Sequence, residues 1–187
     1  MKKKGVRTTF PQVSAPFRRL IGNVVLTPFF FVLACLPLPA SAFDVNGIKL
    51  GGSEVEVKKA MPSAHCKALE WKSEAADRRC DDARVAVGRV ETRITVFLKA
   101  GAVLAYDIRF DTKELERMKS HLRSRWGEPL AEVTEVIAHR DKADRKVFKM
   151  RWEKGAERAL LTAQLEKKRA SLEVSRGNFP VEIYRVR

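Results

Sequence analysis

The sequence has few cysteines and none of the short motifs that mark common catalytic sites. It holds three cysteines in 187 residues, and no Cys-X-X-Cys pair of the kind found in redox enzymes. It also lacks a Gly-X-Ser-X-Gly elbow, a Ser-X-X-Lys acylation motif, a P-loop and a dinucleotide fingerprint. These absences argue against the usual hydrolases and nucleotide-binding enzymes, whereas a site assembled from distant residues would leave no local motif.

Acidic residues are missing from residues 1–42, which carry only basic charges: Lys2, Lys3, Lys4, Arg7, Arg18 and Arg19. An apolar stretch follows over residues 20–36, and polar residues and Pro28 interrupt it, so it is a poor match to the ~20 apolar residues of a spanning helix. The small residues Ala40 and Ala42 then suit a signal peptidase. We predict a secretory signal over residues 1–42 with cleavage before Phe43, and a retained membrane anchor is the alternative.

A second processing route starts from Val32-Leu33-Ala34-Cys35, which resembles the lipobox of bacterial lipoproteins. Acylation of Cys35 would tether the mature protein to a membrane. Leu33 is bulky for its place in that motif, and the Ala-Ser-Ala site downstream is better formed. The prediction is therefore a periplasmic protein, and an outer-membrane lipoprotein is the alternative.

Removal of residues 1–42 changes the charge of the chain. The full sequence has 37 basic and 23 acidic residues, a net charge of +14, and the cut leaves 31 basic against 23 acidic residues, a net charge of +8. A positive protein favours acidic partners. Chromosomal DNA and RNA are not in the predicted compartment, and the sequence has no nucleic-acid-binding motif, so a nucleic-acid partner is not expected.

Two cysteines, Cys66 and Cys80, remain after the cut. In an oxidising compartment two such thiols are expected to pair. The disulfide would close a loop of about 15 residues and contribute ~3 kcal/mol to the free energy of unfolding in the chain-entropy model. Residues 72–79 in this loop are mostly polar, so a structural disulfide is the prediction.

The first half of the mature chain, residues 43–110, predicts a short strand over residues 43–50 and then a helix. Ser53 and Glu56 form a capping box, and Pro62 ends this helix, whose inner side is Val57, Ala60 and Met61. Apolar and polar residues then alternate on both sides of a turn at Ala100-Gly101, which predicts a β-hairpin over residues 90–99 and 102–110.

The second half, residues 111–187, begins with a helix capped at Asp111 or Thr112 and ended by Gly127. Its apolar stripe consists of Leu115, Met118, Leu122 and Trp126. The strand candidates that follow are residues 131–138, 146–152, 158–167, 170–175 and 181–186.

Each half thus predicts a helix followed by antiparallel strands. The expected fold class is α+β, with antiparallel sheet and two helices packed on one face. Two arrangements remain open: a tandem pseudo-repeat with one sheet in each half, and a single continuous sheet within one compact domain of residues 43–187.

The segment Leu50-Gly51-Gly52-Ser53-x-x-Glu56-Val57-x-x-Ala60-Met61-Pro62 resembles the first helix of the BamE (SmpA/OmlA) family of outer-membrane assembly lipoproteins. The predicted helix-then-hairpin order is also similar to that family's fold, and its duplication is similar to the tandem architecture of the β-lactamase inhibitor proteins. Both resemblances imply a protein that works by binding other proteins. The match in residues covers 50–62 only, and Cys66 and Cys80 depart from the family pattern.

Candidate catalytic, metal and cofactor residues are not found by spacing. His65, His121 and His139 are far apart, and none has a metal-ligand spacing with another His, Cys, Asp or Glu. His65 next to Cys66 is the only adjacency, and a bridged sulfur does not bind metal as a thiolate. Neighbouring carboxylates such as Asp81 and Asp82 point apart on a strand and favour a solvated surface.

Basic residues gather in three places of the second half, and together they predict a patch for an anionic partner. The candidate contacts are Arg117, Lys119, Arg123, Arg125, Arg140, Lys142, Arg145, Lys167, Lys168 and Arg169. Trp71, beside the polar disulfide loop, is the tryptophan that we expect at an interface, while Trp126 and Trp152 are expected in the core.

These observations predict a non-enzymatic exported binding, adaptor or inhibitor protein of the bacterial cell envelope. Its partner is expected to be an envelope or surface protein, or an envelope polyanion. The first alternative is an outer-membrane assembly or maintenance factor tethered through Cys35. The second is an exported hydrolase with a dispersed site.

Overall fold

The computed structural model describes residues 43–138 and 144–185. The predicted signal peptide, Cys35, His139, Arg140 and Lys142 lie outside these residues. Among the described residues, no helix is both long enough and apolar enough to cross a membrane.

The described chain forms a two-stranded and an eight-stranded antiparallel sheet with a few short helices, which confirms the predicted α+β class. The strands are β1 (Asp44–Val45), β2 (Ile48–Lys49), β3 (His65–Ala68), β4 (Arg78–Val87), β5 (Val90–Lys99), β6 (Ala102–Phe110), β7 (Ala131–Ile137), β8 (Arg145–Lys154), β9 (Glu157–Gln164) and β10 (Arg169–Arg176). The helices are α1 (Glu54–Ala60), α2 (Leu115–Trp126) and α3 (Phe179–Glu182), with 3₁₀ turns η1 (Thr112–Glu114) and η2 (Leu165–Lys167).

The segment predicted as one strand over residues 43–50 is a miniature hairpin of β1 and β2 instead. Asn46 and Gly47 form its turn with φ angles of 51° and 83°. Two successive positive φ angles belong to the type I′ turn, which Asn-Gly favours. The prediction of a single strand was wrong because this turn signal was overlooked.

The capping box of α1 is confirmed. Ser53 Oγ accepts from the Glu56 backbone nitrogen, and Glu56 Oε2 accepts from the Ser53 backbone nitrogen at 2.6 Å. Val57 and Met61 are buried, whereas Ala60 is exposed. The apolar side of this short helix is therefore narrower than predicted.

Strand β4 occupies part of the segment that the sequence analysis treated as a polar loop. Its buried residues include Cys80 and Asp82 at one end and Val85 and Val87 at the other. The register with β5 shifts between Asp82 and Val85, which marks a β-bulge. This shift breaks the period-two pattern, and the charged residues around Cys80 hide the strand further.

The second half agrees with its predicted pattern except at the C-terminus. Helix α2 buries Leu115, Met118, Leu122 and Trp126, and Gly127 ends it with a φ of 84°. Four strands follow, but the piece predicted as extended over residues 181–186 begins with α3. Phe179 and Ile183, four positions apart, are its buried side chains, and this is a helical spacing.

All eight strands of the large sheet form one continuous layer in the order β3-β4-β5-β6-β10-β9-β8-β7. Each half contributes a four-stranded meander that follows a helix. The last strands of the two meanders, β6 and β10, pair antiparallel with Ile108 opposite Leu172. Of the two arrangements left open by the sequence, the strands therefore adopt the single continuous sheet.

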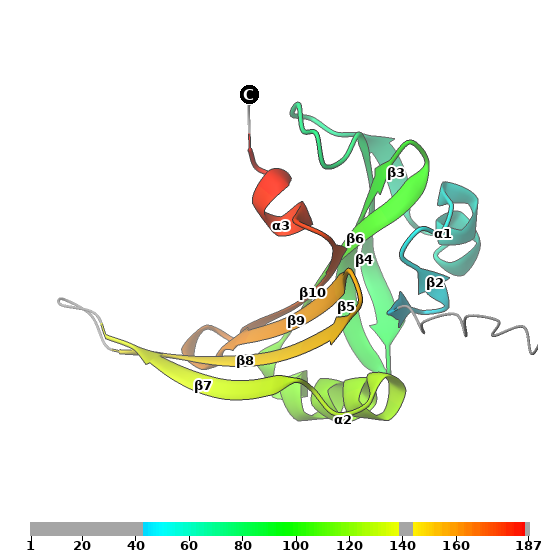
Figure 1. Ribbon diagram of the computed structural model, residues 1–187. Coiled ribbons are helices and arrows are strands. Elements are labelled where there is room, and N and C mark those ends of the chain that lie inside the picture. Colours follow the sequence, from blue (N-terminus) through cyan, green and yellow to red (C-terminus); the bar gives the residue numbers. More distant parts are fainter. Residues whose placement is uncertain (1–42, 139–143, 186–187) are drawn as a thin grey trace, which may run out of the picture. The chain divides into compact units, whose positions relative to one another are not determined.

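The two faces of this sheet differ in composition. One face carries a row of apolar residues across five strands, Ile94, Ile108, Leu172, Leu161 and Met150, and joins the core beneath α1 and α2. The other, which we call the open face, carries Arg93, Arg109, Ser171, Thr162 and Lys149 in the neighbouring row. Figure 1 shows α1 and α2 on one side of the strands and α3 on the other.

One end of the open face is covered by a second, smaller core. Phe97 and Ala105 of the sheet pack there with Phe179 and Ile183 of the C-terminal segment, and the Phe97 and Phe179 ring centroids are 5.3 Å apart. Elsewhere the open face carries mostly polar and charged side chains, and Val147 and Leu160 are apolar exceptions on β8 and β9.

Candidate functional site

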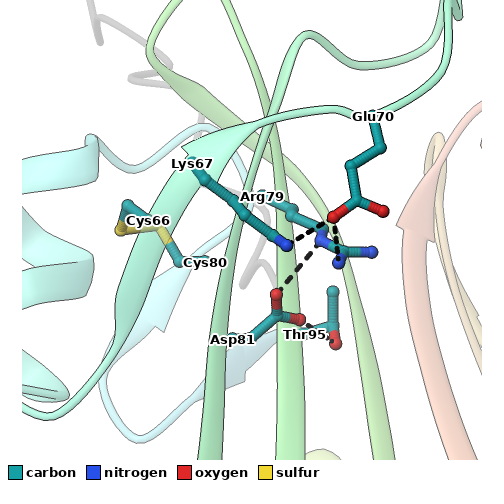
Figure 2. Close-up of polar contacts among 7 residues, drawn as sticks. All are labelled: Cys66, Lys67, Glu70, Arg79, Cys80, Asp81 and Thr95. Carbon is teal, nitrogen blue, oxygen red and sulfur yellow. Dashed lines mark hydrogen bonds and ion pairs between the residues drawn. A yellow bond between two sulfur atoms is a disulfide. The ribbon is translucent and has the colours of Figure 1, made fainter.

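The predicted disulfide between Cys66 and Cys80 is confirmed. The two residues lie directly opposite each other in the β3–β4 register, and their sulfurs are bonded (Figure 2). The bond ties the four-residue edge strand β3 to β4. Glu54 also places a carboxylate oxygen within 4.8 Å of the two sulfurs, but these sulfurs are bonded to each other and offer no thiolate to a metal.

A polar network surrounds the disulfide strands (Figure 2). Arg79 lies between two carboxylates, with Nε 3.1 Å from Asp81 Oδ2 and Nη2 3.4 Å from Glu70 Oε1. Lys67 also pairs with Glu70 at 2.5 Å, and its hydrogen bond is the main cause that lowers the pKa of Glu70. Thr95 Oγ1 donates to Asp81 Oδ1 at 2.8 Å. Since each charge here has a partner within the network, we assign it a structural role.

Trp71 is half-buried and holds the C-terminal segment in place. Its Nε1 donates to the carbonyl of Ile183 at 2.9 Å, and its ring stacks on Tyr184 with centroids 6.1 Å apart. Tyr184 itself is 68% exposed. The exposed aromatic surface at this place therefore belongs mainly to Tyr184, and Trp71, the predicted interface residue, supports it from below by stacking.

The basic residues of α2 are ion-paired within the protein. Arg117 pairs with Glu114, Arg123 with Glu132, and Arg125 with Asp44. Lys119 lies 3.2 Å from Glu132, and its ammonium stands 4.7 Å from the Phe148 ring centroid. Four of the ten predicted anion contacts thus already have acidic partners.

The remaining predicted cations fall in two groups. Lys167, Lys168 and Arg169 are exposed around the η2 turn, and they have no ion-pair partner within residues 43–138 and 144–185. Arg145 is half-buried at the start of β8 and contributes to lowering the pKa of Glu166, for which a hydrogen bond from the Lys146 backbone is the larger cause. Arg140 and Lys142 lie outside the described residues.

The η2 turn borders two adjoining hollows on the open face, which we call the basic groove. One, of about 740 Å³, is lined by Arg93, Arg109, Lys167 and Arg169 among others. The second, of about 650 Å³, shares Arg93, Arg109 and Phe110 with the first and extends to the start of α2. Within the described chain, the cations of the groove without an ion-pair partner are Arg89, Arg93, Lys113, Lys167, Lys168 and Arg169.

The register of the central strands creates the middle of the groove. Arg93 of β5 lies opposite Arg109 of β6, which lies opposite Ser171 of β10, and Ser171 lies opposite Thr162 of β9. Side chains of directly opposed residues emerge on the same face. Two guanidinium groups and two hydroxyl groups therefore stand in one row, although the β10 and β9 members are more than 50 residues from the β6 member in the chain.

Acidic groups also line the basic groove, but their charge is partly offset. Asp107 accepts from Arg109 at 2.6 Å. Glu173 lies beside it on the open face, where burial is the main cause that raises its pKa and the charge of Asp107 is the second. Glu91 is an exposed acid of the second hollow. Unpaired cations still outnumber unpaired acids in the groove, which favours an anionic ligand.

The basic cluster Lys167, Lys168 and Arg169 was predicted as an anion contact and lies at the rim of this groove, whereas the residues at its centre were not predicted. Arg93 and Arg109 belong to the two strands of the predicted hairpin, and the sequence assigned neither of them to a site. Their mutual approach follows from the register of the hairpin, but the approach of β10 to β6 follows from tertiary packing, which carries no local signal.

The histidines lie apart from the basic groove. His65 is exposed on β3, and His121 packs on the opposite side of the sheet between α2 and the β4–β5 turn. Burial is the main cause that lowers the pKa of His121, followed by the charge of Arg125. His139 lies outside the described residues.

Comparison of the chain with protein-family models, curated proteins and solved structures gave no match.

Proposed function

We propose that this is an exported, non-enzymatic binding protein whose basic groove engages an acidic partner protein of the cell envelope. The observation that carries the proposal is that six cations of the groove have no ion-pair partner within the described residues, while the cations of α2 are ion-paired. Unpaired charge of one sign raises the association rate of an oppositely charged partner and favours its selection.

A protein fits this surface better than a small anion, because aromatic and charged groups occur together on it. The exposed Tyr184 lies at the edge of the groove, because it lines a small cavity together with Asp107 and Glu173, which also line the first hollow. Arginine and tyrosine are enriched at protein-binding hot spots. The resemblances to protein-binding families point in the same direction.

Export is part of the proposal. It is supported by the order of basic, apolar and small residues at the N-terminus and by the Cys66–Cys80 disulfide. A disulfide persists most readily outside the reducing cytosol. The proposed form is the periplasmic chain that begins at Phe43.

The test compares two variants of equal charge. The groove variant carries Arg93→Gln, Lys167→Gln and Arg169→Gln, and the control carries Lys58→Gln, Arg123→Gln and Arg125→Gln, whose cations are ion-paired in the native protein. The probe is a polyglutamate peptide, with affinity measured by calorimetry. We expect the groove variant to bind at least tenfold more weakly than the wild type and the control to stay within about twofold. An equal loss of affinity in both variants would show that net charge alone determines binding, and it would contradict the groove as the binding site.

A photo-crosslinking residue in place of Tyr184 would then identify the partner in intact cells. Transfer of the label to an acidic envelope protein is the expected result. Labelling of anionic lipid or polysaccharide in its place would assign the groove to an envelope polyanion.

A further inference from the structure

The first residue of the proposed mature chain places its backbone nitrogen on a buried carboxylate. Phe43 N donates to Glu157 Oε2 at 3.0 Å, and Arg176 Nη2 donates to Glu157 Oε1 at 2.7 Å. The Glu157 side chain is only 8% exposed, at the start of β9. Each oxygen of this carboxylate therefore has its own donor, and the two donors come from opposite ends of the described chain.

The side chain of Phe43 fixes the position of this nitrogen. Its ring packs edge-on against Trp126 at 4.9 Å between centroids, and the ammonium of Lys154 lies 5.0 Å from its centroid. Trp126 packs in turn against Trp152 at 5.7 Å. Phe43 is thus anchored between α2 and β8, and its nitrogen is aimed at Glu157 by packing rather than by a flexible tail.

We infer that signal cleavage before Phe43 creates an α-amino group that becomes an ionic partner of Glu157. This inference rests on the proposed export. In the cleavage, a peptidase adds water across the bond between Ala42 and Phe43: the hydroxyl goes to the carbonyl carbon of Ala42, and the hydrogen goes to the nitrogen of Phe43. The nitrogen then takes a proton from solvent near neutral pH, because the pKa of an α-amino group is ordinarily about 7.7–8.0.

Cleavage changes the nature of the contact at Glu157. Before it, an amide N–H offers one neutral hydrogen bond; after it, an ammonium offers a charge-assisted hydrogen bond of about twice the strength. A buried carboxylate needs opposite charge close by. Arg176 supplies part of this, but its side chain is 44% exposed and its charge is shared with solvent. The ammonium of Phe43 completes the neutralisation from the inner side.

The same geometry sets an order of events. A peptidase needs the residues on both sides of the scissile bond in extended form, and the Phe43 ring is fully buried once folded. Cleavage therefore precedes the docking of Phe43. A lipoprotein that begins at Cys35 would keep the amide at Phe43 and lack this ion pair.

The test uses the full chain, exported and purified from the producing bacterium, and begins with its intact mass. A mass that starts at Phe43 permits the second step, in which the native protein is treated with an amine-acylating reagent at pH 7 and the N-terminal peptide is quantified. We expect the Phe43 amine to react at least tenfold more slowly in the wild type than in Glu157→Gln. The control is Glu153→Gln, which removes an exposed acid of the neighbouring strand and should behave as wild type.

A second measurement, of stability, keeps the inference testable if Glu157→Gln folds poorly. One alanine inserted between Ala42 and Phe43 moves the new terminus by one residue and restores the amide. It should lower the denaturation midpoint in the wild-type background and leave it unchanged in the Glu157→Gln background. Equal acylation rates in wild type and Glu157→Gln would overturn the ion pair, whereas a mass that starts at an acylated Cys35 would overturn the proposed processing itself.

Discussion

At the scale of single residues, His121 and Gly88 form a contact that fixes both. A Cβ added to Gly88 would lie 2.1 Å from His121 Cγ, and Gly88 has a φ of +54°. The imidazole therefore lies directly over the backbone of the β4–β5 turn. Glycine is required there for two reasons, because the turn needs a positive φ and the ring needs the space.

This packing predicts a pH dependence of stability. Burial and then Arg125 lower the pKa of His121, while Asp44 acts in the opposite direction. In the unfolded chain the imidazole takes up a proton near its ordinary pKa of about 6.5, and in the folded chain it does so only at lower pH. The unfolded state then binds more protons, so the free energy of unfolding falls as pH drops from about 6.5 through the folded pKa.

Urea denaturation at pH 7.5 and pH 5.5 measures this effect. The wild type should lose stability between the two, and His121→Gln should lose less. Burial also raises the pKa of Glu173, but this residue is present in both proteins and its effect cancels in the comparison. The same pH dependence in both proteins would show that His121 does not contribute.

At the scale of elements, the Cys66–Cys80 disulfide stabilises β3, an edge strand with few other stabilising contacts. β3 has four residues, none of them fully buried, and within the described part of the chain it pairs with β4 alone. Cys66→Ala with Cys80→Ala should lower the free energy of unfolding by ~3 kcal/mol, as expected for closing a loop of about 15 residues. Hydrogen exchange should locate the change, with amide protection lost in β3 and kept in β5, β6 and β10. Loss of protection throughout the sheet would mean that β3 is needed for the whole fold.

The elements that the sequence predicts are those with a complete local signal. Helix α1 has a capping box, α2 has an apolar stripe and a glycine end, and the β5–β6 hairpin alternates on both sides of its turn. β4 has a bulge in the middle of its pattern, and it was missed. α3 is a single turn held by Trp71 and Phe97, and four residues are too few to show a period.

The candidate site also contains residues that the sequence predicted and residues that it did not. The cations of α2 and of the η2 turn were visible as clusters, but only ion pairing decides which of them are free. Arg123 is ion-paired with Glu132, and Arg125 is ion-paired with Asp44, which lies 81 residues away in the sequence. Such partners cannot be inferred from spacing. Arg93 and Arg109 at the groove centre are polar members of two alternating strands, a pattern that carries no signal of a binding site. They become part of the groove only because β10 and β9 lie beside β6 in the sheet.

At the scale of the whole molecule, the β6–β10 pairing joins the two halves of the sheet. It brings Ala105–Phe110 next to Ala170–Ser175, and it is the only strand pairing between the described halves. The basic groove lies across this seam, so a partner would contact both halves at once.

Two truncations should separate the seam from the C-terminal helix. Removal of residues 177–187 deletes α3 but no strand, so unfolding should stay cooperative, at lower stability and with more binding of a hydrophobic dye to the uncovered Phe97 region. Removal of residues 169–187 also deletes β10 and exposes the facing edges of β6 and β9, and it should abolish cooperative unfolding in thermal denaturation. Equal behaviour of the two truncations would argue against the seam as the element that unites the sheet.

The position of β10 has a consequence for the making of this protein. β10 is the last strand of the described chain but lies in the interior of the sheet. Arg176 at its end contacts the Glu157 carboxylate, which also accepts from Phe43, the first described residue. If the chain is exported from its N-terminus onward, as proposed, the sheet cannot close until residues 169–176 have crossed the membrane. Until then the complete β3–β6 meander and the incomplete β7–β9 meander have unpaired inner edges at β6 and β9, and the emerging chain would depend on holding chaperones.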